Sequence, residues 1–144
     1  MGKHKYFELA EFINSATAKK KGIDNTPSFE VVQHLDELVT EILDPLREAW
    51  GKAIIVTCGY RCQKLNAAVG GVATSAHLLG YAADLQVKGS FDEFKTFVVD
   101  WFKKTGKAFD QLIVETDKKG VKWIHIGLKN KDGKQRRQIL NIAA

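Results

Sequence analysis

The sequence has little cysteine and no long hydrophobic run, and both absences restrict its class. Cys58 and Cys62 are its only cysteines, too few for the disulfide framework of small secreted domains. Their spacing could let them join a histidine at a closed zinc site, but Cys58 ends an apolar segment, which favours free, partly buried thiols. No apolar run approaches the roughly 20 residues of a membrane-spanning helix.

The sequence also lacks the pattern of a secretory signal peptide, internal repeats and low-complexity segments. Residues 1–6 are basic, but no apolar stretch of about 7–15 residues follows them. We therefore expect synthesis in the cytoplasm, with any export by another route. The length of 144 residues fits a single domain, residues 1–144, with one core.

Acidic residues are outnumbered by basic ones, which gives a formal net charge of +5. This charge favours polyanionic partners such as nucleic acid, anionic lipid or an acidic wall polymer, although surplus lysine on a soluble surface explains it equally well. The basic residues form short clusters without interleaved aromatic residues. The sequence therefore predicts no specific nucleic-acid partner.

The spacing of apolar residues predicts helices in the first third of the chain. A small helix is expected near residues 6–12, followed by a lysine-rich loop over residues 18–25. Thr26 is a good N-cap, and Pro27 suits the first position of a long helix. An apolar stripe at three- and four-residue spacing then indicates a helix facing a core. Pro45 falls inside this stripe and should kink the helix or end it early.

Later segments alternate between further helices and short strands. A short helix is expected over residues 61–68, and a capping box at Ser90 and Glu93 begins a helix that Gly106 ends. The predicted strands are residues 53–58, 82–87, 110–116, 121–128 and 135–142. The Asp-Gly pair in the turn at residues 131–133 is typical of a hairpin. These elements predict an α+β fold, with helices packed on one face of a mainly antiparallel sheet.

Two histidines and one aspartate form a candidate metal site. His77 and Asp84 are seven positions apart, which on one straight strand would put them on opposite faces. We therefore expect His77 on a turn, made possible by Gly80, that folds back over the strand of Asp84. His125 alternates with apolar residues and so lies off the core face of its strand. Three such ligands leave a fourth zinc position open, as in catalytic sites.

Each of these residues also has an ordinary interpretation when taken alone. His77 would then be a solvated loop residue, His125 a strand residue without a role, and Asp84 a cap or turn residue. The other two histidines have only ordinary interpretations. His4 lies in an N-terminus that we expect to be frayed, and His34 lies on the polar side of the predicted long helix.

Several segments together resemble the zinc D-alanyl-D-alanine carboxypeptidase family. That family includes D-Ala-D-Ala dipeptidases and phage L-alanyl-D-glutamate endolysin peptidases. The amino-terminal domain of hedgehog proteins belongs to the same group, so the expected fold is hedgehog-like. The resemblance rests on SxHxxGxAxD at residues 75–84, WxH at 123–125, TCGYR at 57–61, LNxxVGG at 65–71 and FDQLIxE at 109–115. It extends over roughly residues 7–128, most of the chain.

The resemblance implies a site and a reaction. It implies that His77, Asp84 and His125 bind Zn²⁺, and that the protein cleaves peptide bonds in peptidoglycan stem peptides. Arg61 stands where the family places an arginine that holds a substrate carboxylate or the developing oxyanion. Its alternative is a surface residue that caps the preceding strand. Ser75 would contact the substrate or hold the turn of His77.

One position departs from the family pattern and concerns the general base. Many members carry an acidic residue three positions before the last histidine, where this chain has Lys122. Glu115 is then the candidate base. Pairing of Thr116 with Val121 would turn Glu115 away from the metal ligands. Pairing of Asp117 with Val121 would place Glu115 on their face, and the resemblance favours this second register.

We therefore predict a monomeric zinc metallopeptidase whose partner is peptidoglycan or its peptide fragments. It would act as a D,D-carboxypeptidase or an L,D-type endopeptidase. A phage-encoded lysin released to the cell wall, or a cytoplasmic dipeptidase, fits the missing signal peptide. The alternative is a non-catalytic zinc module that binds wall polymer or a protein partner, which Lys122 favours.

Overall fold

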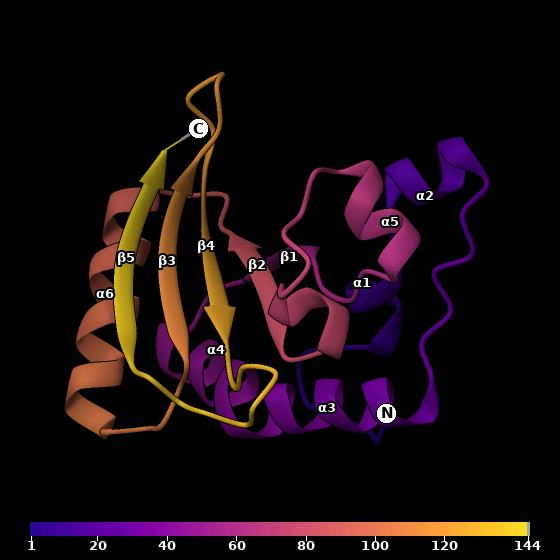
Figure 1. Ribbon diagram of the computed structural model, residues 1–144. Helices are drawn as coiled ribbons and strands as arrows, with labels where there is room; N and C mark the ends of the chain where they lie inside the picture. Colours follow the sequence, from indigo (N-terminus) through magenta and orange to yellow (C-terminus); the bar gives the residue numbers. More distant parts are fainter. Residues whose placement is uncertain (144) are drawn as a thin grey trace.

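A five-stranded sheet forms the centre of the molecule (Figure 1). The computed structural model describes residues 1–143. The strands are β1 (Ile55–Cys58), β2 (Ala82–Gln86), β3 (Gln111–Thr116), β4 (Lys122–Gly127) and β5 (Gln138–Ala143), in the order β1-β2-β4-β3-β5. Only β5 pairs in parallel, with β3, and the other three pairings are antiparallel. The predicted mainly antiparallel sheet is confirmed.

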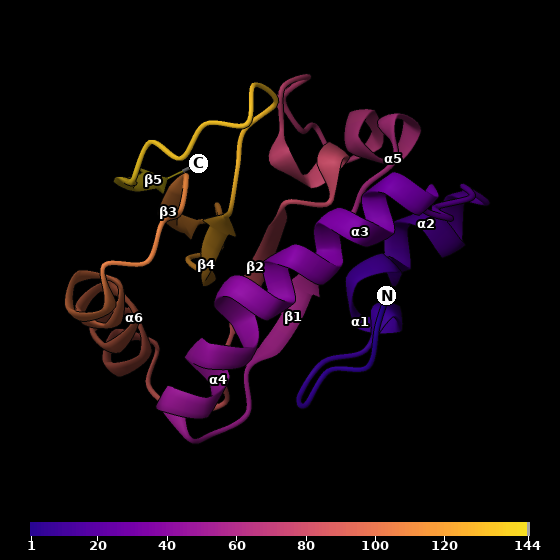
Figure 2. The same cartoon turned by 90° about the horizontal axis from the view of Figure 1, so that it is seen from below.

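Helices precede the sheet and connect its strands. They are α1 (Leu9–Ile13), α2 (Ala16–Lys21), α3 (Phe29–Leu38), the π-helix η1 (Val39–Leu43), α4 (Asp44–Trp50), α5 (Gln63–Ala68), the 3₁₀ turn η2 (Ala76–Leu79) and α6 (Phe91–Thr105). Figure 2 shows α4 and α6 on one side of the sheet, and η2 with the β4–β5 connection on the other. None of the helices in residues 1–143 combines the length and apolar character needed to cross a membrane.

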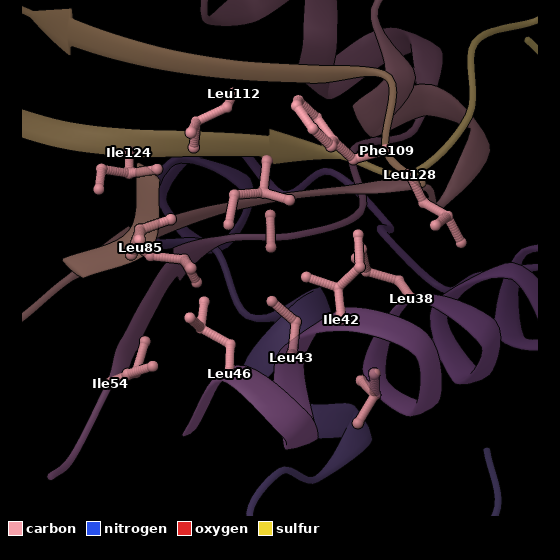
Figure 3. Packing of buried hydrophobic residues seen from close by; sticks show 14 of the residues in the cluster. Leu38, Ile42, Leu43, Leu46, Ile54, Leu85, Phe109, Leu112, Ile124 and Leu128 are labelled. Carbon is pink, nitrogen blue, oxygen red and sulfur yellow. The ribbon is translucent and has the colours of Figure 1, made fainter. Parts of the chain in front are cut away.

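The core lies between the sheet and the continuous helical stretch α3–η1–α4. In Figure 3, Leu85, Leu112 and Ile124 point from the sheet toward Ile42 and Leu46. All five side chains are buried. The apolar stripe of α6 packs into the same cluster. One face of the sheet is thereby buried in the core, and its other face points away from the core.

The long helix passes through Pro45 instead of ending there. Pro45 occupies the first turn of α4, and the π-helical turn η1 directly precedes it. Proline lacks a backbone N–H and cannot complete a regular helical turn, and a π turn re-routes the local hydrogen bonds. The expected irregularity is therefore present, but an early end at Pro45 is wrong.

The start of this helix also differs from the prediction. Ser28 is the N-cap, and its Oγ accepts a hydrogen bond from the backbone N–H of Val31 at 3.2 Å. Thr26 instead donates its hydroxyl to the carboxylate of Asp24 at 2.6 Å. The side chain of Thr26 is therefore engaged in a local turn and cannot cap the helix.

Part of the lysine-rich segment at residues 18–25 is helical, so its prediction as a loop is wrong. Ser15 caps α2 through the N–H of Ala18, and Gly22 ends it at a φ of 65°. Three lysines occupy the last turn of α2, where positive charge is favourable to the helix dipole. The cap and the dipole explain a helix that the lysine content alone did not indicate.

Both edge strands differ from expectation. β1 was expected to be a buried strand, but it lies at the sheet edge, and Ile55 is 38% exposed. The turn at Asp132-Gly133 forms, since Gly133 bonds to the carbonyl of Asn130. It does not lead to a hairpin, because both edges of β4 are already occupied by β2 and β3. β5 therefore continues past β3 and pairs with its outer edge.

Candidate metal centre

Adjacent strands bring two of the predicted ligands together. Asp84 of β2 stands directly opposite His125 of β4. Across the other edge of β4, Ile113 of β3 is the neighbour of His125. The face of the sheet that points away from the core thus carries a row of side chains with Asp84 and His125 at its centre. Ile124 and Ile126, which flank His125, are buried in the core as predicted.

The turn η2 brings the third ligand over this row. The N–H of His77 bonds to the Oγ of Ser75 at 3.2 Å. Gly80 ends the turn at a φ of 80°, and a Cβ there would lie 2.8 Å from the carbonyl oxygen of Val31. Glycine is therefore needed both for the backbone conformation and for the close approach of α3. The expected turn that returns His77 to the strand of Asp84 is present.

The three side chains present their ligand atoms to one point. Nε2 of His77 lies 3.2 Å from Oδ1 of Asp84, and Nδ1 of His125 lies 3.2 Å from that nitrogen and 3.1 Å from that oxygen. Tetrahedral zinc with bonds of about 2.0–2.1 Å separates its ligand atoms by about 3.3 Å. This nearly equilateral triangle therefore fits three corners of a zinc site.

The second nitrogen of His77 is held by the backbone. Nδ1 donates to the carbonyl of Gly59 at 2.6 Å, which leaves the lone pair of Nε2 for a metal, as is usual for histidine ligands. Cys58 Sγ lies 3.8 Å from the same Nδ1 and belongs to an alternative ligand set with His77 and Asp84. Because Gly59 engages Nδ1, we favour the set that uses Nε2.

The two cysteines do not form a disulfide with each other, and Cys58 belongs to a possible ligand set with His77 and Asp84. Both thiols are free. Cys62 caps α5 by accepting the N–H of Leu65. Both side chains are partly buried, as expected, and whether Cys58 binds metal stays a prediction.

Electrostatics tie His77 to Asp84. Burial opposes protonation of His77, yet the neighbouring carboxylate raises the pKa of this imidazole to about 10. Burial would likewise raise the pKa of Asp84, but His77 and His125 hold that pKa well below its usual range. Without metal the pair is thus an imidazolium and a carboxylate. A divalent cation would supply the positive charge in place of that proton.

Glu115 lies beside the triangle. It stands opposite Trp123, and the backbone of Asp117 bonds to Val121, so the second register is confirmed. Its Oε1 is 3.8 Å from Nδ1 of His125. Burial, and then the charge of Asp84, raise the pKa of this carboxyl. The position suits a general base, and that role stays a prediction.

Lys122 occupies the other face of β4. It is exposed, and it lies an odd number of positions from His125 along the strand, which turns its side chain away from the ligands. An acidic residue at this position would point away from His125 in the register found here.

Arg61 and Ser75 lie together at the side of the metal centre. Nη2 of Arg61 donates to Oγ of Ser75 at 3.3 Å, and its backbone N–H bonds to the carbonyl of His77 at 3.1 Å. Nε of Arg61 is buried without a hydrogen-bond partner among residues 1–143. This placement differs from a surface residue that caps a strand. Ser75 holds the turn of His77, and its contact with substrate stays a prediction.

The two remaining histidines have structural contacts. His34 donates from Nδ1 to the carbonyl of Leu79 at 2.6 Å and stacks on Tyr81. It thereby supports the turn η2 from the side of α3. His4 is not frayed, because its ring contacts the carboxylates of Asp36 and Asp44.

A cavity of about 680 Å³ opens over the metal centre. Glu115, Arg61 and the three predicted ligands line it, together with residues that the sequence did not mark as functional. Two of these are Asp110 and Arg136. Asp110 lies in the FDQLIxE segment of the family resemblance but had no predicted role. The guanidinium of Arg136 donates two hydrogen bonds to the Asp110 carboxylate, at 2.7 and 2.8 Å. No local motif distinguishes Arg136, because only the pairing of β5 with β3 brings it to the cavity.

The comparisons with known proteins agree with this geometry. A family model described as Peptidase M15 matches residues 5–127. Fold and site therefore define a peptidase of the metal-dependent class. The chain belongs to the peptidase M15 family, whose members are typically zinc-dependent. No curated protein matches the chain.

Proposed function

We propose that the protein is a zinc peptidase that hydrolyses peptide bonds in peptidoglycan stem peptides. The observation that carries this proposal is the ligand triangle of His77, Asp84 and His125 with a glutamate beside it. Three protein ligands leave one zinc position open for water or substrate, whereas structural zinc sites are closed by four. Membership of the M15 family supports the same reaction class.

Each residue of the site has a defined task in this mechanism. When bound, zinc lowers the pKa of water to about 7 and polarises a carbonyl oxygen. Glu115 accepts the proton of the attacking water at Oε1 and passes it to the leaving amine. The raised pKa of this carboxyl makes Glu115 a stronger base toward the attacking water. Its partial burial keeps competing water away.

Arg61 acts on the substrate. Its guanidinium can hold a carboxylate through parallel hydrogen bonds, or stabilise negative charge that develops on the scissile carbonyl. The bond to Ser75 fixes one of its nitrogens. The Nε of Arg61 is buried and has no hydrogen-bond partner among residues 1–143. A hydrogen bond to a substrate oxygen would offset the free-energy cost of burying this donor.

The assignment of peptidoglycan rests on the family resemblance and on charge. A net charge of +5 attracts the protein to an anionic cell wall. A D,D-carboxypeptidase or an L,D-type endopeptidase would act on these stem peptides. The protein would reach stem peptides in the wall if it is released there as a phage-type lysin. As a dipeptidase it would meet peptide fragments in the cytoplasm.

The test uses purified sacculi and the zinc-loaded protein. We expect released peptides or D-alanine in mass spectra of the soluble fraction, and loss of release with a chelator. Glu115→Gln should lower the rate by about 10²–10⁴-fold while zinc content, measured by atomic absorption, stays that of the wild type. Lys122→Gln is the matched control and should retain the rate.

The proposal is wrong if the zinc-loaded wild type releases nothing from sacculi of several wall chemotypes. The non-catalytic alternative drew its support from Lys122. We favour the enzyme over this alternative because Lys122 lies on the other face of β4 and Glu115 lies beside His125. Wall binding without peptide release would restore the alternative.

A further inference from the structure

One wall of the catalytic cavity comes from outside the family match. The match ends at residue 127, whereas β5 spans Gln138–Ala143. Leu140 and Ile142 of β5 nevertheless line the cavity over the metal centre. These side chains are 37% and 51% exposed. They are therefore available to a ligand.

The register of β5 shows where these two side chains lie relative to His125 and Glu115. Leu140 is the neighbour of Ile113, which is itself the neighbour of His125. Two strand spacings of about 4.8 Å put Leu140 about 10 Å from His125. Ile142 is the neighbour of Glu115. The apolar wall therefore begins at Ile142, beside the candidate base, and continues two residues along β5, about 7 Å, to Leu140.

Two further apolar side chains line the same cavity, beside polar ones such as Arg61 and Ser75. Val69 and Val72, from the loop after α5, line it and are exposed. With Leu140 and Ile142 they account for four of the eight large hydrophobic residues that are exposed among residues 1–143. Exposed apolar side chains scattered singly need no explanation, but their gathering around one cleft indicates a ligand site.

An ion pair fixes the wall to the rest of the sheet. Asp110, just before β3, is buried, and both its carboxylate oxygens accept hydrogen bonds from Arg136. The backbone N–H of Arg136 also bonds to Asp110, and that of Arg137 bonds to Phe109. Rigid walls give selectivity, because a mobile one would adapt to any side chain.

We infer that β5 is the specificity wall of the cavity: Leu140 and Ile142 bind an uncharged aliphatic side chain of a substrate residue adjacent to the scissile bond. This inference rests on the proposed peptidase function. Asp110 and Arg136 are positioning residues that hold the wall in place. A charged side chain at the same substrate position would lose hydration against Leu140 and Ile142 and would bind less well.

The test compares matched substitutions on the two faces of β5. Leu140→Thr and Ile142→Thr remove aliphatic contact, and the threonine that each introduces is a β-branched residue suited to a strand. Ile139→Thr is the control, because Ile139 is equally exposed but lies on the other face and does not line the cavity. The substrates are synthetic stem pentapeptides with alanine, valine or serine on either side of the bond that the wild type cleaves.

We expect the wild type and Ile139→Thr to prefer valine or alanine over serine at one of these positions. Either cavity substitution should reduce this preference in kcat/KM by about tenfold, the usual effect of losing one or two methylene contacts. The zinc content should be unchanged. Calorimetric binding of the uncleaved peptides to Glu115→Gln should show the same loss when that variant also carries Leu140→Thr.

The outcomes separate this inference from the proposed function. A wild type that cleaves no pentapeptide contradicts the proposed function. A wild type that cleaves, with cavity variants that keep the selectivity of Ile139→Thr, overturns only the specificity wall. If a variant has a lower melting temperature, the ratio between substrates still decides, because a loss of folded protein lowers all rates equally.

Discussion

The metal centre depends on three residues that are each ordinary when considered alone. His77 comes from a turn, and Asp84 and His125 come from neighbouring strands. Their ligand atoms converge within 3.1–3.2 Å. In the absence of metal, the proton on His77 holds this arrangement together. A metal ion and a proton must therefore compete for Nε2 of His77.

This competition predicts a pH dependence of zinc affinity. The pKa of His77, raised to about 10 by Asp84, means that zinc must displace a proton from Nε2 at neutral pH. Affinity should rise about tenfold per pH unit below about pH 7, where zinc-bound water keeps its proton and one proton leaves per ion. Calorimetry in two buffers of different ionisation enthalpy measures the number of protons released.

The control for this prediction is another histidine beside carboxylates. His4 contacts Asp36 and Asp44 but lies outside the centre, so His4→Asn should leave proton release near one per zinc. An affinity that does not change with pH would contradict the assignment of His77 as a protonated partner of Asp84.

Among the elements, the turn η2 combines a left-handed backbone conformation with a close backbone contact, both at Gly80. Gly80 has a φ of 80°, and a Cβ there would lie 2.8 Å from the backbone of Val31. Gly51 has a similar φ of 76° but has nothing within 4 Å of its Cβ position. The two glycines share a backbone conformation and differ in their surroundings.

We expect Gly80→Ala to cost more stability than Gly51→Ala. The shared φ should cost each variant about 1–2 kcal/mol, and the clash with α3 should add about 1–3 kcal/mol at Gly80. Urea denaturation measures both free energies of unfolding. Only Gly80→Ala should also weaken zinc binding, because its turn carries His77. Equal costs would show that α3 yields to the added methyl group.

The attachment of β5 provides a second prediction at this scale. Burial would raise the pKa of Asp110, but its bonds to Arg136 hold that pKa below its usual range. The stabilisation is therefore present above the unfolded pKa of about 3.9 and is lost as pH falls through the lower folded pKa. Asp110→Asn should destabilise the protein at pH 7 by about 1–2 kcal/mol, a value reduced because Arg136 is partly exposed.

Urea denaturation at two pH values tests the role of Asp110. The difference between wild type and Asp110→Asn should shrink as pH falls to about 3. Asp117→Asn is a control in an exposed turn with backbone hydrogen bonds only. A difference that is the same at both pH values would mean that the charge of Asp110 does not contribute.

At the scale of the whole molecule, local patterns predicted the site better than the topology. The alternation around His125 and the glycine after His77 act within a few residues, and the structure has both features. The register of Glu115 depended on a single turn. The place of β5 depended on which strand edges remained free, a property of the assembled sheet that no short segment of sequence contains.

The same distinction explains the helices. Ser90 and Gly106 bound α6 as predicted, because capping acts between near neighbours. The start of α3 was misplaced by two residues, because Thr26 and Ser28 are both good caps. Only the competing bond from Thr26 to Asp24 decides between them.

A last prediction concerns the link that zinc would make between distant parts of the chain. Its ligands come from η2, β2 and β4, and binding to the folded state alone stabilises by about 2.7 kcal/mol at a zinc concentration 100 times the dissociation constant. For a chain of 144 residues, this should raise the melting temperature by about 5–10 °C. Scanning calorimetry with zinc and with chelator measures the shift. His125→Ala should abolish most of it, whereas Cys62→Ala, outside the triangle, should retain it. A full shift in His125→Ala would place the bound zinc elsewhere, for example at the set that includes Cys58.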